Sequence, residues 1–208
     1  MSGLRDHEVS FLRRLDPPWR IQRFLDGLEY DVRGSGCRSP RRVLRERCVQ
    51  CMDGALFAAA ALRVQGHVPL IVDLEAERDS DHVLAVYRAN GAWGALACSN
   101  YSGLRSREPV YRTLRELVMS YFDCYFNLRR EKTLRRYSRP IDLRRFDARD
   151  WMGDSANLWY IPEYLVGVRH YALLSQAQEH ALGLTDRRLF QAGLVGHVGP
   201  AAGKPRTP

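Results

Sequence analysis

The chain has 208 residues and a mass of 23.9 kDa, a length typical of one large domain rather than two independent folds. Hydrophobic residues make up 45% and charged residues 27%, which excludes a disordered, collagen-like or low-complexity chain. Lysine and arginine outnumber aspartate and glutamate by 32 to 24, and the net charge of +8 permits an anionic partner.

The cysteine count and the uncharged runs indicate the compartment. Five cysteines are an odd number in a chain long enough to bury an ordinary core, which argues against a secreted disulfide scaffold. The first twenty residues carry charges throughout and contain no apolar stretch that resembles a signal peptide. The longest uncharged runs, 89–104 and 189–203, are broken by Gly, Asn, Ser or Pro and are too short to span a bilayer. We therefore expect a cytoplasmic protein without a membrane segment.

The first quarter of the chain predicts two helices separated by a loop. Asp16 and the two prolines after it are typical of an N-cap and first turn, followed by an amphipathic helix through residue 28. Residues 31–42 contain Gly, Ser and Pro and predict a loop within an arginine-rich connector. Residues 51–65 are almost free of charge and rich in alanine, which predicts a helix buried on most sides and ended by Gly66.

Three strands are predicted next, at 68–74, 81–87 and 93–99. The Asn90-Gly91 pair is the turn signal that makes the last two a hairpin. The segment before the second strand is rich in carboxylates and forms an acidic lip, made of Asp73, Glu75, Glu77, Asp79 and Asp81.

The C-terminal half predicts helices. Thr113 and Glu116 have the spacing of a capping box, and apolar residues then recur at helical spacing as far as residue 126. A last helix is predicted from residue 162 towards 182, and the tail after Gly199 is expected to be disordered. Between these helices, residues 129–149 hold nine cations against three carboxylates, which suggests either a solvated face or a surface for an anionic partner.

Cys51 occupies the position that a cysteine nucleophile requires. At the start of a buried helix, the macrodipole and the free backbone N–H groups favour a thiolate and can also hold an oxyanion. His82 opens the second strand, where an imidazole can serve as the base that hydrolytic cysteine chemistry needs. Ser99 and Asn100 end the third strand and could hydrogen-bond the far ring nitrogen.

These residues resemble the nucleophile region of the transglutaminase-like, papain-related superfamily. In that family the cysteine is followed by Ala, Arg and Gly at the spacings found here for Ala55, Arg63 and Gly66, and the catalytic histidine opens a later strand. The similarity covers about residues 48–100, and the segment 102–127 also resembles uncharacterised bacterial relatives. The resemblance implies that Cys51 is the nucleophile and His82 the base.

The third catalytic residue is where the chain departs from the family pattern. The family's Asp would fall between Ala97 and Asn100, where the chain has no carboxylate. Papain-like enzymes use Asn to orient the imidazole, so Asn100 is the first candidate and Ser99 the second. Strand alternation allows at most one of them to face His82, and a water or a carboxylate from elsewhere remains the alternative.

Cys48 and Cys51 also form a C-x-x-C pair, which can indicate a metal or redox site. A zinc site requires a second pair at short spacing, whereas Cys98 and Cys124 stand alone. A thioredoxin-like motif follows a buried strand, and the charged residues before Cys48 do not predict one. No metal and no cofactor are therefore expected.

The sequence thus predicts an α+β fold in which a buried Cys-bearing helix packs on a small antiparallel sheet, flanked by N-terminal and C-terminal helices. The expected organisation is an N-terminal helix and connector (1–47), a transglutaminase-like core (48–112), C-terminal helices (113–198) and a tail (199–208). The expected function is cysteine-dependent acyl chemistry on an amide or peptide substrate, ending in hydrolysis or acyl transfer. The rival is a catalytically silent module that binds an anionic partner through its arginines. The residues name neither the substrate nor the oligomeric state.

Overall fold

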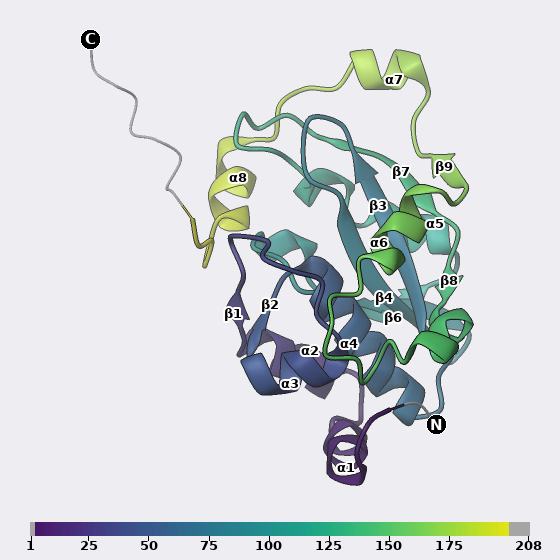
Figure 1. The fold of residues 1–208 in the computed structure, drawn as a ribbon. Coiled ribbons are helices and arrows are strands. Elements are labelled where there is room, and N and C mark those ends of the chain that lie inside the picture. The colour runs from purple at the N-terminus through teal and green to yellow at the C-terminus, as the bar shows by residue number, and fades with distance from the viewer. Residues whose placement is uncertain (1–2, 200–208) are drawn as a thin grey trace.

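The computed structural model describes residues 3–199, and its centre is a seven-stranded antiparallel sheet (Figure 1). The strands lie in the order β6-β5-β4-β3-β7-β9, and β8 also pairs with β3. The sheet strands are β3 (Leu70–Ala76), β4 (His82–Ala89), β5 (Ala92–Leu96), β6 (Arg107–Tyr111), β7 (Leu134–Ser138), β8 (Ile141–Asp142) and β9 (His170–Ala172). Two short strands, β1 (Glu29–Tyr30) and β2 (Cys48–Val49), pair in parallel apart from this sheet.

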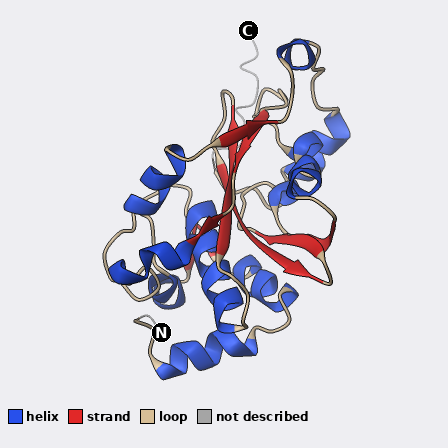
Figure 2. Ribbon diagram, turned by 90° about the vertical axis from the view of Figure 1, so that its right-hand side faces the viewer, coloured by secondary structure: helices blue, strands red, loops and turns tan. Residues whose placement is uncertain are grey.

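Helices cover both faces of the sheet (Figure 2). The α-helices are α1 (Asp6–Arg14), α2 (Trp19–Asp26), α3 (Pro40–Glu46), α4 (Cys51–Val64), α5 (Leu114–Met119), α6 (Tyr160–Val166), α7 (Gln176–His180) and α8 (Arg187–Gly193). Short 3-10 helices span Ser102–Leu104, Phe122–Cys124 and Leu143–Arg149. On one face of the sheet, a core cluster contains residues of helices α1, α2, α3, α4 and α6. On the other face, a second cluster contains residues of α5 and the tyrosines that follow it.

Helix α4 confirms the predicted buried helix and is fixed closely against the sheet. Its residues from Ala55 to Leu62 are fully buried, because small side chains allow the helix to contact neighbours on every side. A Cβ atom added at Gly54 would lie only 2.5 Å from the Cβ of Cys98, so the first turn of α4 touches the chain just after β5. This contact places Cys51 at the end of the sheet.

The three predicted strands are confirmed as β3, β4 and β5. Asn90 and Gly91 both have positive φ angles, of 51° and 81°, as a two-residue hairpin turn between β4 and β5 requires. In the β3–β4 register His82 pairs with Leu74, so His82 lies at the same end of the sheet as the N-terminus of α4.

The predicted long helix over 113–126 is wrong beyond its first turns. Thr113 caps α5 as expected, through a hydrogen bond from the Glu116 N–H to its hydroxyl, but α5 ends at Met119. The chain then becomes extended, because the carbonyl of Tyr125 accepts a hydrogen bond from the Thr133 N–H at 3.0 Å. After α5, Tyr121 and Tyr125 are buried in the second core cluster rather than on one face of a helix.

The predicted helix over 162–182 is also wrong as a single element. Helix α6 ends at Val166, and the chain continues as β9, which pairs with β7 at the edge of the sheet. His170 of β9 reaches across β7 and places its Nε2 atom 3.0 Å from the carboxylate of Asp73. Pairing at the sheet edge outweighs the helical spacing of the apolar residues.

The predicted loop over 31–42 contains the start of a helix instead. Ser39 is the N-cap of α3, its hydroxyl accepting a hydrogen bond from the Arg42 N–H, and Pro40 occupies the first helical position. Ser-Pro is a helix-start signal as well as a turn signal, and here the helix follows.

The α+β class with a Cys-bearing helix on an antiparallel sheet is therefore confirmed. The sheet is larger than predicted, because residues 113–198 contribute β7, β8 and β9 as well as helices. Within residues 3–199 no helix is both long and apolar enough to cross a bilayer. The predicted disordered tail lies, apart from Gly199, outside the described residues.

Candidate active site

Cys51 is the first residue of α4 and is half-buried. The first turn of a helix leaves backbone N–H groups without helical partners, and they give this end a partial positive charge. Burial raises the pKa of the Cys51 thiol, while the nearby backbone N–H groups of Val83 and Met52 act in the opposite direction. The sulfur therefore lies against the backbone of the residue that follows His82.

His82 is buried at the start of β4, and one hydrogen bond orients its ring. Its Nε2 atom lies 2.8 Å from the carbonyl oxygen of Leu104. A carbonyl only accepts hydrogen bonds, so Nε2 carries the proton and donates it. In the neutral imidazole this leaves Nδ1 as a proton acceptor.

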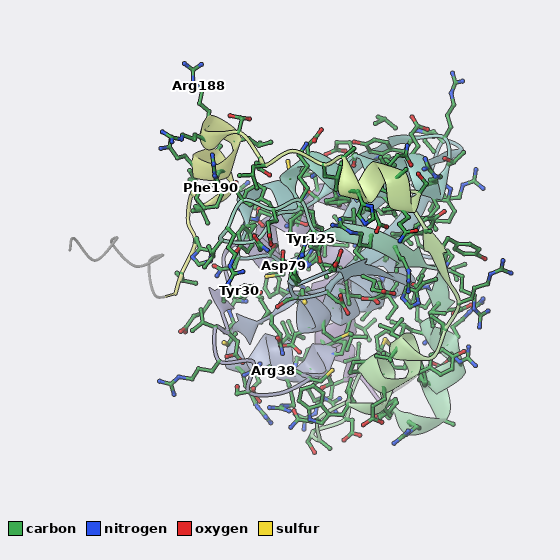
Figure 3. All side chains as sticks on the ribbon, turned by 90° about the horizontal axis from the view of Figure 1, so that it is seen from above. Tyr30, Arg38, Asp79, Tyr125, Arg188 and Phe190 are labelled. Carbon is green, nitrogen blue, oxygen red and sulfur yellow. The ribbon has the colours of Figure 1, made fainter. Side chains whose placement is uncertain are left out.

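Cys51 and His82 line one cavity of about 390 Å³. Ser99 and Asn100 line it as well, so all four predicted site residues border the same space. Aromatic and acidic side chains complete its wall, among them Tyr30, Asp31, Asp79, Asp81, Tyr101, Tyr125 and Phe126. In Figure 3 the labelled residues Tyr30, Asp79 and Tyr125 lie together near the middle of the view.

Both members of the pair are neutral at rest. Burial raises the pKa of the Cys51 thiol to about 11, against the smaller opposing effect of the two N–H groups. Burial lowers the pKa of His82 to about 4, and the positive charge of Arg107 acts in the same direction. Between about pH 4 and pH 11 the site therefore holds a thiol and a neutral imidazole rather than a thiolate–imidazolium ion pair.

The structure does not place Asn100 or Ser99 in the orienting role predicted for them. The Asn100 amide forms hydrogen bonds with the backbone of Val198, at 2.7 and 2.8 Å. The Ser99 hydroxyl accepts one from the Tyr101 N–H at 3.0 Å. The acceptor on the His82 ring is the main-chain carbonyl of Leu104 rather than a side chain.

The turn that carries Leu104 is fixed by two buried contacts. The Arg107 guanidinium donates to the carbonyl of Gly103 at 2.9 Å and stacks over the ring of Tyr121. The Tyr121 hydroxyl donates to the carbonyl of Arg105 at 2.8 Å. The carbonyls on both sides of Leu104 are thus held, and Arg107 both positions the turn and disfavours a charge on His82.

The predicted acidic lip only partly faces the cavity. Asp79 and Asp81 line it, although each also supports its own loop: Asp79 accepts from the Thr133 hydroxyl and Asp81 from the Ala76 N–H, both at 2.8 Å. Asp73 pairs with His170, as described above. The remaining carboxylates, Glu75 and Glu77, form ion pairs with arginines of β7.

The ion pairs of Glu75 and Glu77 involve arginines of the basic stretch 129–149. Carboxylates pair with four of its nine cations: Lys132, Arg135, Arg136 and Arg144. Two others, Arg145 and Arg149, stack over the rings of Tyr164 and Tyr160 at 4.0 and 3.5 Å. Much of the positive charge of this stretch is therefore engaged within the chain.

The five cysteines are all free thiols, including the C-x-x-C pair of Cys48 and Cys51. Among residues 3–199 no group of three or more His, Cys, Asp or Glu side chains is arranged to hold a metal ion.

The buried neutral imidazole predicts a dependence of stability on pH. His82 has a pKa of about 4 in the folded chain and about 6.5 when unfolded, so the unfolded chain binds more protons between these values. The corresponding stability is present above pH ~6.5 and is lost as the pH falls through ~4, by about 3 kcal/mol for a shift of this size. Because the raised pKa of Asp73 acts in the opposite direction over part of this range, the loss is measured as the difference between urea denaturation of the wild-type chain and of His82→Gln. An imidazole NMR signal of His82 that titrates near its ordinary pKa would contradict the prediction.

Comparison with known proteins does not place the chain in a family. No protein-family model matches it, and no curated protein matches it.

Proposed function

We propose that the protein carries out acyl chemistry on an amide or peptide bond through a thioester at Cys51, with His82 as the base. The observation that carries the proposal is the single cavity lined by a thiol at a helix N-terminus and by an imidazole whose distal nitrogen is bound to the Leu104 carbonyl. The nucleophile, the base and an orienting acceptor are the parts that such chemistry requires. The resemblance of the Cys51 region to transglutaminase-like proteins supports the same proposal.

In the first step the Cys51 sulfur attacks the substrate carbonyl carbon while its proton moves to Nδ1 of His82. The C=O electron pair moves to oxygen, and the oxyanion faces the N–H groups at the start of α4. Collapse of this intermediate breaks the C–N bond, and the imidazolium gives its proton to the leaving amine. A thioester and a free amine result.

In the second step an acceptor, water or an amine, attacks the thioester carbonyl and gives its proton to His82. The sulfur then leaves and recovers a proton from the imidazolium, which yields an acid or a new amide. Hydrolysis and acyl transfer share every group on the protein and differ only in the acceptor.

The resting protonation states favour general-base catalysis over a preformed thiolate. The pKa of Cys51 is raised and that of His82 is lowered, so the proton moves only as the sulfur attacks. The Leu104 carbonyl can accept a hydrogen bond from Nε2–H in both the neutral and the charged ring, and this holds the ring in one orientation while Nδ1 takes up and releases the proton.

A bifunctional alkylating agent tests the pair without a known substrate. Dibromoacetone reacts first with a thiol and then with a second nucleophile within its short span. We expect it to join Cys51 to His82, as a cross-linked peptide pair in tandem mass spectrometry. His82→Gln should leave only singly alkylated Cys51, and the half-buried Cys48 and Cys124 serve as internal controls.

Alkylation of Cys51 without any link to His82 in the wild-type chain would overturn the proposed pair. The silent-module alternative would then be supported by steeply salt-dependent binding of the chain to nucleic acid.

A further inference from the structure

The side chain of Asn100 holds the backbone of the C-terminal segment. Its carbonyl oxygen accepts from the Val198 N–H at 2.8 Å, and its amide nitrogen donates to the Val198 carbonyl at 2.7 Å. One amide thus satisfies both main-chain groups of a single residue. We call residues 195–199 the strap.

The chain that leads to this contact is anchored as well. Before it, Phe190 of α8 packs on Phe126 with ring centroids 5.4 Å apart, and the Ser102 hydroxyl donates to the Ala192 carbonyl at 2.6 Å. Within the strap, the His197 ring packs edge-on against Tyr101. Figure 3 shows Phe190 on the side of α8 that faces the body of the protein, with Arg188 pointing away.

The strap forms one wall of a second cavity, of about 510 Å³, beside the site. This cavity shares part of its lining with the one that holds Cys51, through Tyr30, Val32, Ser99 and Asn100. The strap therefore lies beside the wall, Asn100 included, that this cavity shares with the one that holds Cys51.

Apart from the His197 ring, what the protein holds in the strap is its main chain. Val195 and Val198 are 71% and 47% exposed, whereas the Val198 N–H and carbonyl are both bound to Asn100. Recognition through main-chain groups depends little on the side chains of the bound segment.

We propose that Asn100 is a docking residue for the backbone of a peptide, and that the strap occupies this position in cis. This inference rests on the proposed function, because it identifies the substrate as a peptide. The peptide chain would run from the second cavity towards Cys51. A peptide must then displace the strap, and the tethered strap competes at a high effective concentration. The chain's own C-terminal segment thereby limits access to its site.

A binding experiment in the full-length chain with Cys51→Ala tests this without turnover. The probe is a fluorescent synthetic peptide with the sequence of residues 190–199, followed by fluorescence anisotropy. Val198→Pro removes the strap N–H and His197→Ala removes the contact with Tyr101, and together they should release the strap. We expect the released chain to bind the peptide at least about tenfold more tightly than the parent.

Two further variants make the result specific. Arg188→Ala changes an exposed side chain of α8 that points away from the body of the protein, and it should leave peptide affinity as in the parent. Asn100→Leu, added to the released chain, should abolish the gain. Equal affinity in the parent and the released chain, or a gain that survives Asn100→Leu, would overturn the proposal. The binding experiment uses the Cys51→Ala chain and does not depend on catalysis. If the released chain binds the peptide more tightly but the wild-type chain gives no Cys51–His82 cross-link, Asn100 is the docking residue and the catalytic pair is wrong. If the cross-link forms but release of the strap does not increase peptide affinity, only the role of Asn100 is wrong.

Discussion

Cys51→Ala should abolish the acylation that p-nitrophenyl acetate produces at this position, with less than about 1 kcal/mol of change in the free energy of unfolding. The reason is that the half-buried Cys51 thiol is the proposed nucleophile and, at the N-terminus of α4, contributes little packing to the core. The measurements are the initial burst of p-nitrophenolate, the mass of the acetylated chain and urea denaturation.

His82→Gln is the companion variant, because it removes the base and leaves the sulfur in place. Loss of general-base catalysis should slow acylation by about 10²–10⁴-fold. If Cys51→Ala instead strongly destabilised the fold, Cys51 would be a core residue rather than a nucleophile. If His82→Gln left the acylation rate unchanged, His82 would not be the base.

Arg38→Met should destabilise the protein by about 3–5 kcal/mol at neutral pH, because it leaves buried carboxylates without their cation. Arg38 is 7% exposed and forms ion pairs with Asp31, Glu46 and Asp53 at 2.8 to 3.0 Å. Asp53 is completely buried in the first turn of α4, where its carboxylate also accepts from the Gln50 N–H. The network thus holds the helix end that carries Cys51, and urea denaturation measures its contribution.

Arg45→Met is the matched control, because Arg45 pairs with the same Glu46 but is exposed, and its loss should cost less than about 1 kcal/mol.

The Arg38 network also predicts that acid destabilises the protein. Hydrogen bonds from Arg42, Arg45 and Arg38 outweigh burial and lower the pKa of Glu46 to about 2. A lowered carboxyl pKa gives stability that is present above the ordinary value of ~4.3 and is lost as the pH falls towards ~2. Equal losses of unfolding free energy in Arg38→Met and Arg45→Met would contradict the buried network.

The sequence predicted the centre of the fold better than its periphery. The segments 51–65 and 81–99 have patterns that are locally decisive: a charge-free alanine-rich run, and alternating strands around Asn-Gly. The segments 113–126 and 162–182 have helical spacing as well, but there the chain is fixed by partners distant in sequence, such as Thr133 for Tyr125 and β7 for β9. Such contacts leave no periodic trace in the sequence.

The residues of the candidate site were also predictable only in part. Cys51 and His82 could be proposed from the sequence because a nucleophile and a base must be particular side chains at particular positions, and the structure places both at one cavity. Asn100 and Ser99 border the same cavity, yet their hydrogen bonds go elsewhere. The acceptor on the His82 ring is a main-chain group that every residue possesses, so no residue type marks it.

That acceptor also affects how the site responds to mutation. Any residue placed at position 104 brings the same carbonyl, so no side-chain substitution there deletes the third member of the proposed catalytic group. An alanine scan of the whole chain would register Cys51 and His82 and would describe the site as a dyad. Substitution of Arg107 or Tyr121, which hold the neighbouring carbonyls, would instead perturb the acceptor from a distance and leave no altered residue in contact with the imidazole. Genetic dissection alone would therefore undercount the groups that this site uses.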